Sequence, residues 1–283
     1  MKYGLVMEGG AMRGMFTAGV LDVFMENNIT FDGAIGTSAG AVFGCNLKSR
    51  QIGRAIRYNL RFCKDWHYGT FRSLLHSGDM YDYDYCYRVI PRTLDIWDED
   101  AYCNNPMEFR VVCVDVETGE PVYHLCMNGD DEDIHWFGAS GSMPLVSNII
   151  EINGQKLLDG GVIDSIALKA HENFGYEKNV VILTQPRNFR KEQTFLWRLI
   201  KWRYPKYPKL AEAWRLRAER YNETLEYIRQ QEKLGKALVL APPEVLPVKR
   251  VDHNPQHLQA AYDIGRQVGL ENLNKIKEFL TIS

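Results

Sequence analysis

The sequence has 283 residues, 45% of them apolar and 25% charged, with 34 Lys+Arg against 36 Asp+Glu and a formal net charge of -2. This is the composition of a globular protein with a sizeable core rather than of a disordered chain, and the near-zero net charge gives no overall case for nucleic-acid binding. No uninterrupted apolar run approaches the roughly 20 residues that span a bilayer, and the charged residues Lys2 and Glu8 come too early for a signal peptide.

Strands and helices alternate in the N-terminal half. Residues 3–7 predict a short apolar strand, a glycine-rich turn follows, and apolar side chains recur at helical spacing over 15–27. Residues 31–35 predict the next strand, which is followed by a second glycine-flanked turn and a helix over 39–47. Repeated units of this kind predict an α/β fold with a mostly parallel sheet covered by helices.

The second half contains further strands. Residues 109–116 predict a strong strand that pairs with 121–126 as a hairpin, and 180–183 and 237–240 predict two more buried strands. These runs extend the sheet predicted from the first half.

We expect the chain to divide into an α/β core over 1–186 and a basic, mainly helical region over 187–283 that packs on it. From Gln256 onward the pattern of apolar residues is helical to the end, and Gly269 is expected to break this helix.

Neither the cysteines nor the acidic residues form a pattern that predicts a bound metal. The six cysteines are scattered without a Cys-x-x-Cys pair, which favours reduced, mostly buried thiols in a cytoplasmic protein. The acidic run 130–133 is contiguous, unlike the spaced ligands of a calcium loop, so a helix start is favoured. We therefore expect no metal and no cofactor.

The first motif is the glycine-rich turn between the strand 3–7 and the following helix. Such a turn exposes backbone N–H groups at the positive end of a helix and so favours an anion. A tight turn without a ligand is the simpler interpretation, and a dinucleotide loop is a third, although its acidic partner Asp32 would begin the second strand rather than end it. The residues of the turn are Gly9, Gly10, Ala11, Arg13 and Gly14.

The second motif, Gly36-Thr37-Ser38-Ala39-Gly40, has the form G-x-S-x-G and lies between a predicted strand and a predicted helix. In that context Gly36 and Gly40 allow a sharp turn that lifts the Ser38 hydroxyl above the strand ends, as a nucleophilic serine requires. The alternative is a serine that only caps the helix.

The third motif is Asp159-Gly160-Gly161, which follows two leucines. Its glycines let the backbone turn tightly and let another group approach the carboxylate. Taken alone, this motif is ordinary turn chemistry.

A conventional α/β-hydrolase with a Ser-Asp-His triad is a rival interpretation, because His171, His253 and His257 follow Asp159 in the chain. That fold places its serine after several strands, whereas Ser38 follows only the second predicted strand. None of the three histidines lies in a recognisable local motif, so surface or structural roles are favoured for them.

In this order, the three motifs resemble those of the patatin-like phospholipase family, in its bacterial form, over roughly residues 3 to 185. The resemblance implies a three-layer α/β/α fold, with 1–186 as the catalytic core and a helical C-terminal extension. The family's glycine-rich motif commonly carries three glycines in a row, and Ala11 replaces the third here. The replacement keeps the backbone N–H but makes a positive φ costly.

The resemblance also implies a function: a lipid acyl-ester hydrolase of phospholipase A or lysophospholipase type. Ser38 would be the nucleophile and Asp159 its base, the backbone N–H groups of residues 9–11 would hold the oxyanion, and Arg13 would steady the turn or attract a phosphate-bearing substrate. An unperturbed aspartate, with a pKa of about 3.9, is a weak base, so we expect Asp159 in a narrow, partly dry cleft that raises its pKa. The alternatives are a small-ester or thioester hydrolase with the same dyad, and a non-catalytic lipid- or nucleotide-binding module.

Residues 187–220 hold eleven basic side chains, three acidic ones and the aromatic residues Trp197, Trp202 and Trp214. Basic and aromatic residues interleaved in this way suit peripheral contact with an anionic membrane. A solvated pair of helices is the alternative, and nucleic acid, which the pattern also fits, is not the expected partner. The tyrosines that alternate over 81–87 would, in an extended chain, either line an acyl groove or pack.

Overall fold

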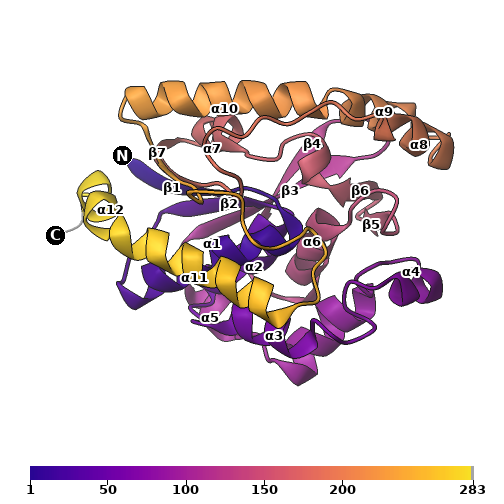
Figure 1. Ribbon diagram of the computed structural model, residues 1–283, viewed down its shortest axis with the longest axis horizontal. Coiled ribbons are helices and arrows are strands. Elements are labelled where there is room, and N and C mark those ends of the chain that lie inside the picture. Colours follow the sequence, from indigo (N-terminus) through magenta and orange to yellow (C-terminus); the bar gives the residue numbers. More distant parts are fainter. Residues whose placement is uncertain (282–283) are drawn as a thin grey trace.

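In residues 1–281, which the computed structural model describes, eight strands form one mixed sheet between two layers of helices (Figure 1). The strands are β1 (Lys2–Met7), β2 (Gly33–Thr37), β3 (Glu108–Asp115), β4 (Pro121–Cys126), β5 (Ile150–Ile152), β6 (Gln155–Asp159), β7 (Tyr176–Ile182) and β8 (Ala237–Leu240). Their order is β5-β6-β3-β2-β1-β7-β8, with β4 paired to β3 off this path. The neighbouring strands β3, β2, β1, β7 and β8 pair in parallel. The pairs β3–β4, β3–β6 and β5–β6 are antiparallel.

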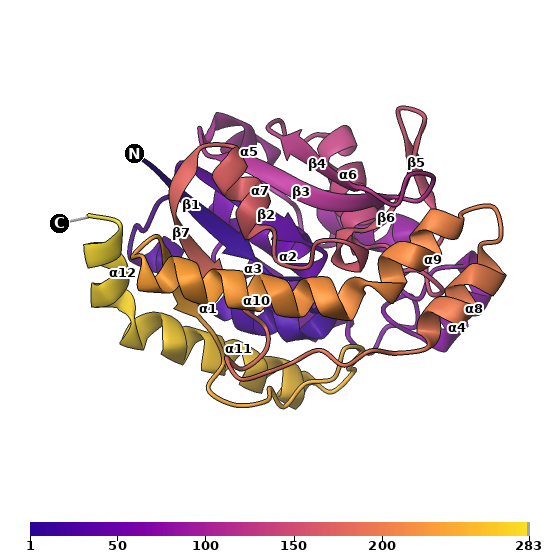
Figure 2. The ribbon, with the colours of Figure 1, turned by 90° about the horizontal axis from the view of Figure 1, so that it is seen from above.

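Helices cover both faces of the sheet. Figure 1 shows α1, α2 and α11 below the sheet and α7 and α10 above it, and Figure 2, which is seen from above, shows α10 in front. This is the predicted three-layer α/β/α fold. The α-helices are α1 (Gly14–Glu26), α2 (Ala39–Lys48), α3 (Arg54–Phe62), α4 (Phe71–Ser77), α5 (Glu99–Asn104), α6 (Asp131–Gly141), α7 (Leu168–Asn173), α8 (Leu196–Arg203), α9 (Pro208–Arg215), α10 (Arg217–Lys233), α11 (Pro255–Glu271) and α12 (Leu273–Phe279). In the part of the chain that the structure describes, none of them has the length and apolar character needed to cross a membrane.

The parallel strands are buried on both faces because helices lie on each side of them. On β1, Val6 belongs to the apolar cluster that Tyr221 and Leu225 of α10 complete. Its neighbours Leu5 and Met7 belong to the cluster on the opposite face, which α1 and α2 complete. This double burial explains why these strands are nearly continuous apolar runs in the sequence.

The C-terminal region contributes to the core itself. The strand β8 pairs with β7 at the edge of the sheet, and α11 packs along α1. The predicted helix break at Gly269 is wrong, because α11 continues to Glu271 and Gly269 instead gives room to Val23 of α1. The division of the chain after residue 186 stays a prediction.

The helices α1 and α11 cross with their backbones in contact. A Cβ atom on Gly19 would lie 2.1 Å from the carbonyl oxygen of Tyr262, and one on Gly265 would lie 2.0 Å from that of Phe16. Such distances are far inside van der Waals contact, so the two glycines are what allow this close crossing.

We expect Gly265→Ala to lower the free energy of unfolding by about 1–3 kcal/mol, because the added methyl group must push the two helices apart. Urea titration followed by circular dichroism measures the change. Gln267→Ala, on the exposed side of the same helix, is the matched control and should change stability by less than about 0.5 kcal/mol. Wild-type stability in Gly265→Ala would contradict the close crossing.

Candidate active site

The three predicted motifs come together at one edge of the sheet. Because β1 and β2 are parallel, the glycine-rich turn after β1 and the serine after β2 lie at the same end. The strand β6 runs antiparallel to β3 and ends at Asp159, the partner of Cys113. The preceding residue of β3, Val112, pairs with Thr37 at the end of β2. Thus β2 and β6 meet end to end along β3, which brings Ser38 to Asp159.

Ser38 and Asp159 form a direct hydrogen bond in the protein interior. The Ser38 Oγ donates to Oδ2 of Asp159 at 2.6 Å, and the two residues are only 7% and 4% exposed. Ser38 has φ 55° and ψ -122°, a backbone conformation that costs a non-glycine residue about 1–3 kcal/mol. The other carboxylate oxygen, Oδ1, accepts the backbone N–H of Gly161 at 2.7 Å. The carboxylate is therefore held in one orientation toward a serine in a strained turn.

Glycines leave room where the backbones meet at this site. A Cβ atom on Gly36 would lie 2.4 Å from the carbonyl oxygen of Gly40, and one on Gly40 would lie 2.4 Å from that of Met7. A Cβ atom on Gly160 would lie 2.3 Å from the carbonyl oxygen of Val112. Any larger residue at these three positions would force apart the turns that hold Ser38 and Asp159.

Ser140 links the two strand ends and was not among the predicted site residues. Its Oγ donates to the carbonyl oxygen of Val112 at 2.7 Å and accepts the N–H of Ser38 at 2.9 Å. Val112 lies where β3 changes partner from β2 to β6, so the sheet itself leaves backbone groups open there. Ser140 satisfies them and fixes the backbone of Ser38.

The glycine-rich turn lies beside Ser38 and offers backbone donors. The Gly9 N–H already donates to the carbonyl oxygen of Ser165 at 3.2 Å, whereas those of Gly10 and Ala11 have no hydrogen-bond acceptor among the described residues. Two of the three predicted oxyanion donors are thus open. Ala11 has φ 50°, the left-handed conformation that costs a residue with a side chain about 1–2 kcal/mol.

Arg13 and Gly14 follow this turn. A Cβ atom on Gly14 would lie 2.8 Å from the Cβ of Ala39, so this glycine lets α1 pack against α2. Arg13 ends a short 3-10 helix, Ala11–Arg13, and its buried Nε has no hydrogen-bond partner among residues 1–281.

Burial raises the pKa of Asp159 above its ordinary value. The hydrogen bonds from Ser38 and Gly161, and the nearby cations Arg217 and Lys191, act in the opposite direction but do not outweigh burial. The carboxylate therefore lies in the dry surroundings predicted for it and is a stronger base than an exposed aspartate.

An apolar cavity of about 280 Å³ opens at Ser38. The tyrosine run 81–87 contributes to its wall, although not as an extended chain, because Tyr85–Leu94 forms a π-helix. The aromatic and aliphatic side chains around the cavity include Val42, Phe43, Tyr58, Tyr68, Tyr81, Tyr87, Ile90, Trp97, Ile134 and Phe137.

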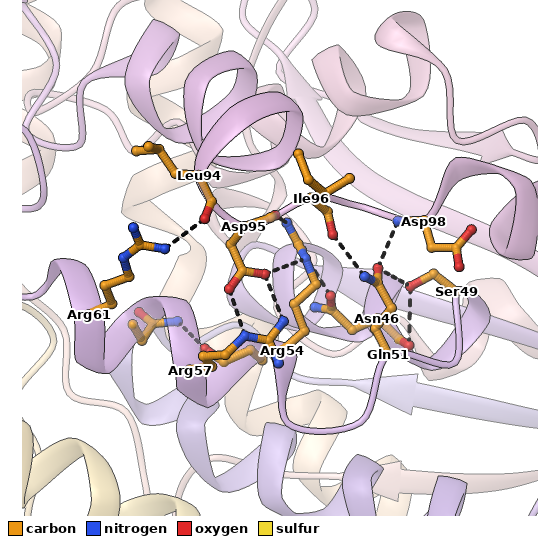
Figure 3. A network of polar contacts seen from close by, with 12 residues as sticks. Asn46, Ser49, Gln51, Arg54, Arg57, Arg61, Leu94, Asp95, Ile96 and Asp98 are labelled. Atoms are coloured by element: carbon orange, nitrogen blue, oxygen red, sulfur yellow. Dashed lines mark hydrogen bonds and ion pairs between the residues drawn. The ribbon is translucent and has the colours of Figure 1, made fainter.

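A polar network holds the wall of this apolar cavity in place (Figure 3). Arg54, which lines the cavity, forms an ion pair with Asp95 at 3.2 Å. Arg57 donates to both carboxylate oxygens of Asp95, at 2.7 and 2.8 Å. Asp95 follows the π-helix directly, so the two arginines of α3 fix the end of that helix.

A second, narrow and polar cavity contains Ser38 and Asp159 together with four cations: Arg13, Lys191, Arg217 and Arg250. None of the four cations forms an ion pair within 4.0 Å with any acidic residue of the described chain. The sequence shows Lys191 and Arg217 only as members of a basic segment and gives no signal for Arg250.

The residues of the rival interpretations lie elsewhere. Asp32 accepts the N–H of Tyr3 at 2.6 Å, at the end of β1 opposite the glycine-rich turn, so it does not serve a dinucleotide there. No histidine lines either cavity within the described residues. The three candidate histidines contact other groups: His171 contacts Asn179, His253 contacts the carbonyl oxygen of Cys63, and His257 contacts Asp252.

One cluster elsewhere has donors of the kind that metals bind. His124, Cys126 and Asp133 offer ligand atoms within 4.8 Å of one another. However, Oδ2 of Asp133 already accepts the backbone N–H groups of Asn128 and Gly129, each at 2.7 Å, just before α6. The acidic run 130–133 begins α6, as predicted.

The fold and the site define a three-layer α/β protein with a serine–aspartate pair at the carboxyl edge of its sheet. The chain belongs to the patatin-like phospholipase family, whose model, described as "Patatin-like phospholipase", matches residues 5–170. A second model, described as a domain of unknown function (DUF6363), matches residues 207–281.

Two curated proteins are similar to the chain. The "Uncharacterized protein YjjU" of Escherichia coli (strain K12) is 27% identical over 218 residues, which cover 71% of this chain and 57% of that protein. The "Lysophospholipase nte1" of Aspergillus terreus is 25% identical over 293 residues, which cover 97% of this chain and 18% of that protein. The chain thus spans less than two thirds of either relative. The crystal structure of VipD from Legionella pneumophila aligns over 97% of this chain and 67% of its own, with a TM-score of 0.48 and 12% identity.

We expect Asp159→Asn to be at least as stable as the wild type at neutral pH. A carboxyl group whose pKa is raised on folding destabilises the folded state when it is ionised, and this cost disappears as the pH falls and the group takes up a proton. The amide removes the charge, so its advantage in free energy of unfolding should be largest at neutral pH and shrink in acid. Urea titrations across this pH range measure it, with Asp263→Asn, an exposed carboxyl of α11, as the control. A marked loss of stability at neutral pH would contradict the burial cost.

Proposed function

We propose that the protein hydrolyses carboxylic esters of lipids, as a phospholipase A or lysophospholipase does, with Ser38 as nucleophile and Asp159 as its base. The observation that carries the proposal is the buried 2.6 Å hydrogen bond between Asp159 and Ser38, which lines the apolar cavity. A serine in a strained turn, bonded to a carboxylate of raised pKa, is arranged to lose its proton and attack. Membership of the patatin-like phospholipase family supports a lipid ester as the substrate.

In the proposed reaction, Asp159 takes the hydroxyl proton of Ser38 while Oγ attacks the ester carbonyl carbon. The negative charge that develops on the carbonyl oxygen is directed to the N–H groups of Gly10 and Ala11, and a single such donor contributes about 2.7–4 kcal/mol in enzymes that use it. The alcohol leaves with the proton from Asp159, and the acyl group stays on Ser38. A water molecule then gives a proton to Asp159 and attacks the acyl carbon. The fatty acid leaves as Ser38 recovers the proton.

The apolar cavity supports a long acyl chain over the small acyl group of a simple ester or thioester. Each buried methylene group contributes about 0.8 kcal/mol, and a volume of about 280 Å³ behind Ser38 offers room for several of them. A non-catalytic lipid-binding module would have use for the cavity but none for the strained backbone of Ser38. The relative named as a lysophospholipase fits the same proposal.

We further propose that α8 brings the protein to an anionic membrane. Phe195, Leu199 and Trp202 are 73%, 45% and 76% exposed, and their i, i+4, i+7 spacing makes one apolar stripe that faces solvent. Arg198 and Lys201 lie between them in the sequence and form no ion pair with described residues. Figure 2 shows α8 at one end of the molecule. An exposed apolar stripe flanked by cations suits a lipid surface. The cytoplasmic location stays a prediction.

We expect Ser38→Ala to abolish hydrolysis of lysophospholipids and of short-chain acyl esters without loss of folding, because the alanine removes only the attacking oxygen. Asp159→Asn should have a similar effect, because the amide cannot take the serine proton. Release of fatty acid and of a chromogenic alcohol measures both variants against Ser77→Ala, which lies outside both cavities and should keep wild-type rates. Unchanged turnover in Ser38→Ala would remove the assignment, and unchanged turnover in Asp159→Asn alone would remove the base.

For the membrane contact, we expect Trp202→Ser to weaken binding to phosphatidylglycerol vesicles by about tenfold or more, because a large apolar side chain no longer enters the lipid. Co-sedimentation at low and high salt measures it. Leu234→Ser, another exposed apolar residue at the end of α10, is the matched control. Vesicle binding that depends on neither salt nor Trp202 would argue against this surface.

A further inference from the structure

We infer that the narrow polar cavity beside Ser38 is a subsite for a compact phosphate group, held by Arg13, Lys191, Arg217 and Arg250. The inference rests on the proposed function and deepens it, because the phosphate would belong to the lipid ester whose acyl chain occupies the apolar cavity. The substrate class is therefore a glycerolipid with a phosphate close to the cleaved ester.

The geometry places these cations at the reacting residues. All four line the cavity that contains Ser38 and Asp159. The Nε of Arg217 donates to the carbonyl oxygen of Gly161 at 2.5 Å, so this guanidinium lies beside the D-G-G turn. The Lys191 Nζ lies 3.7 Å from the centre of the Tyr221 ring, and among residues 1–281 it has no hydrogen-bond acceptor.

Positive charge is in excess around this cavity. Two acids attract these cations: Asp159, which lines the cavity, and Glu8, which lies outside its lining. The oxygens of Glu8 are taken by neutral donors, the Thr184 N–H at 2.6 Å and the Tyr221 hydroxyl at 2.7 Å. Partly buried cations without a paired anion are costly, and a bound anion with several acceptor oxygens removes that cost through charge-assisted hydrogen bonds.

Burial and mutual repulsion disfavour the charged forms of this cluster. The pKa of Lys191 is lowered to about 6 by burial and by repulsion from Arg217, Arg250 and Arg13, against the opposing attraction of Glu8. Burial likewise lowers the pKa of Arg217 to about 10. A dianion among these groups would favour their charged forms.

The number of basic side chains around the site favours phosphate over a carboxylate. A phosphate group has three or more acceptor oxygens and can contact several cations at once, whereas a carboxylate has two. The cavity is narrow, which favours an unsubstituted phosphate over one that carries a bulky head group. Ser38 lines both cavities, so the phosphate and the acyl chain would lie on opposite sides of the ester, as the glycerol backbone of a phospholipid arranges them.

Three of these cations come from outside the part of the chain that the patatin-like phospholipase model matches. That model ends at residue 170, whereas Lys191, Arg217 and Arg250 follow it, and the last two lie in the region of the second model. The C-terminal region would therefore supply the head-group selectivity of the site.

The test compares three substrates with one acyl chain: oleoyl glycerol, oleoyl lysophosphatidylcholine and oleoyl lysophosphatidic acid. We expect kcat/KM for the lysophosphatidic acid to exceed that for the neutral glycerol ester by about tenfold or more, with the choline ester between them. Lys191→Met should reduce this preference about tenfold, and Lys191→Arg should keep most of it. Lys275→Met, which removes an exposed lysine of α12, is the matched control and should leave the preference unchanged.

Equal kcat/KM for the neutral and the phosphate-bearing ester, or an unchanged preference in Lys191→Met, would overturn the inference. A second measurement that does not need turnover is the affinity of the Ser38→Ala variant for lysophosphatidic acid, glycerol 3-phosphate and inorganic phosphate, determined by calorimetry. If the wild type hydrolyses none of the esters, the proposed function fails, whereas glycerol 3-phosphate bound by Ser38→Ala and lost on adding Lys191→Met would still support the subsite. Inorganic phosphate bound as tightly as lysophosphatidic acid, with no preference among the esters, would overturn the lipid assignment in favour of a free-phosphate site.

Discussion

The hydrogen bond between Ser38 and Asp159, at the point where β2 and β6 meet along β3, is the contact on which the rest of the site depends. Both partners are costly to hold, since Ser38 has a left-handed backbone and Asp159 is a buried carboxylate. The surrounding structure offsets this cost with fixed donors: Gly161 bonds the carboxylate, and Ser140 bonds the N–H of Ser38. The glycines of the three motifs follow from the same constraint, because the turns must approach one another more closely than side chains allow.

The basic segment 187–220 has at least three parts with different surroundings, which its overall charge conceals. Lys191 and Arg217 face the polar cavity, whereas Arg198 and Lys201 flank the exposed apolar stripe of α8. A third group is neutralised by acids, two from α10 and one from α9: Arg187 pairs with Glu232, Arg190 with Glu226, and Arg215 with Glu212. Charge that looks uniform along the sequence is thus divided by the fold between the interior, an exposed helix and ordinary surface pairs.

The sequence predicts the motif turns and the parallel sheet well because both depend on local patterns. Apolar runs mark buried strands, and glycines at fixed spacing mark the turns that need them. The predicted strands 121–126 and 237–240 have the bounds of β4 and β8. By contrast, the pattern yields no elements for 49–107, where short helices and a π-helix containing Pro91 depend on contacts such as the Asp95 ion pairs.

The parts of the site that sequence reasoning misses are contributed by tertiary structure. Ser140 has a role only because β3 changes partners at Val112, and Arg250 reaches the site from a loop after β8. No spacing pattern assigns a role to either residue, so sequence reasoning could not place them at the site.

The residues proposed for ester cleavage and those proposed to select the head group come from different parts of the chain. The proposed nucleophile, its proposed base and most of the apolar cavity come from the part of the chain that the family model matches, whereas three of the four basic side chains of the polar cavity come from beyond it. Attack on an ester carbonyl requires Ser38, Asp159 and the open N–H groups of the turn, all fixed by the sheet edge and its glycines.

Recognition of a polar head group requires only side chains that line the polar cavity beside the Ser38 Oγ, on the side away from the apolar cavity. Arg217 is carried by α10, Lys191 by the loop between β7 and α8, and Arg250 by the loop after β8, so the charge of the polar cavity can change without moving the strands that bring Ser38 to Asp159. The fold therefore allows the preference for a head group to vary while the proposed ester chemistry stays the same.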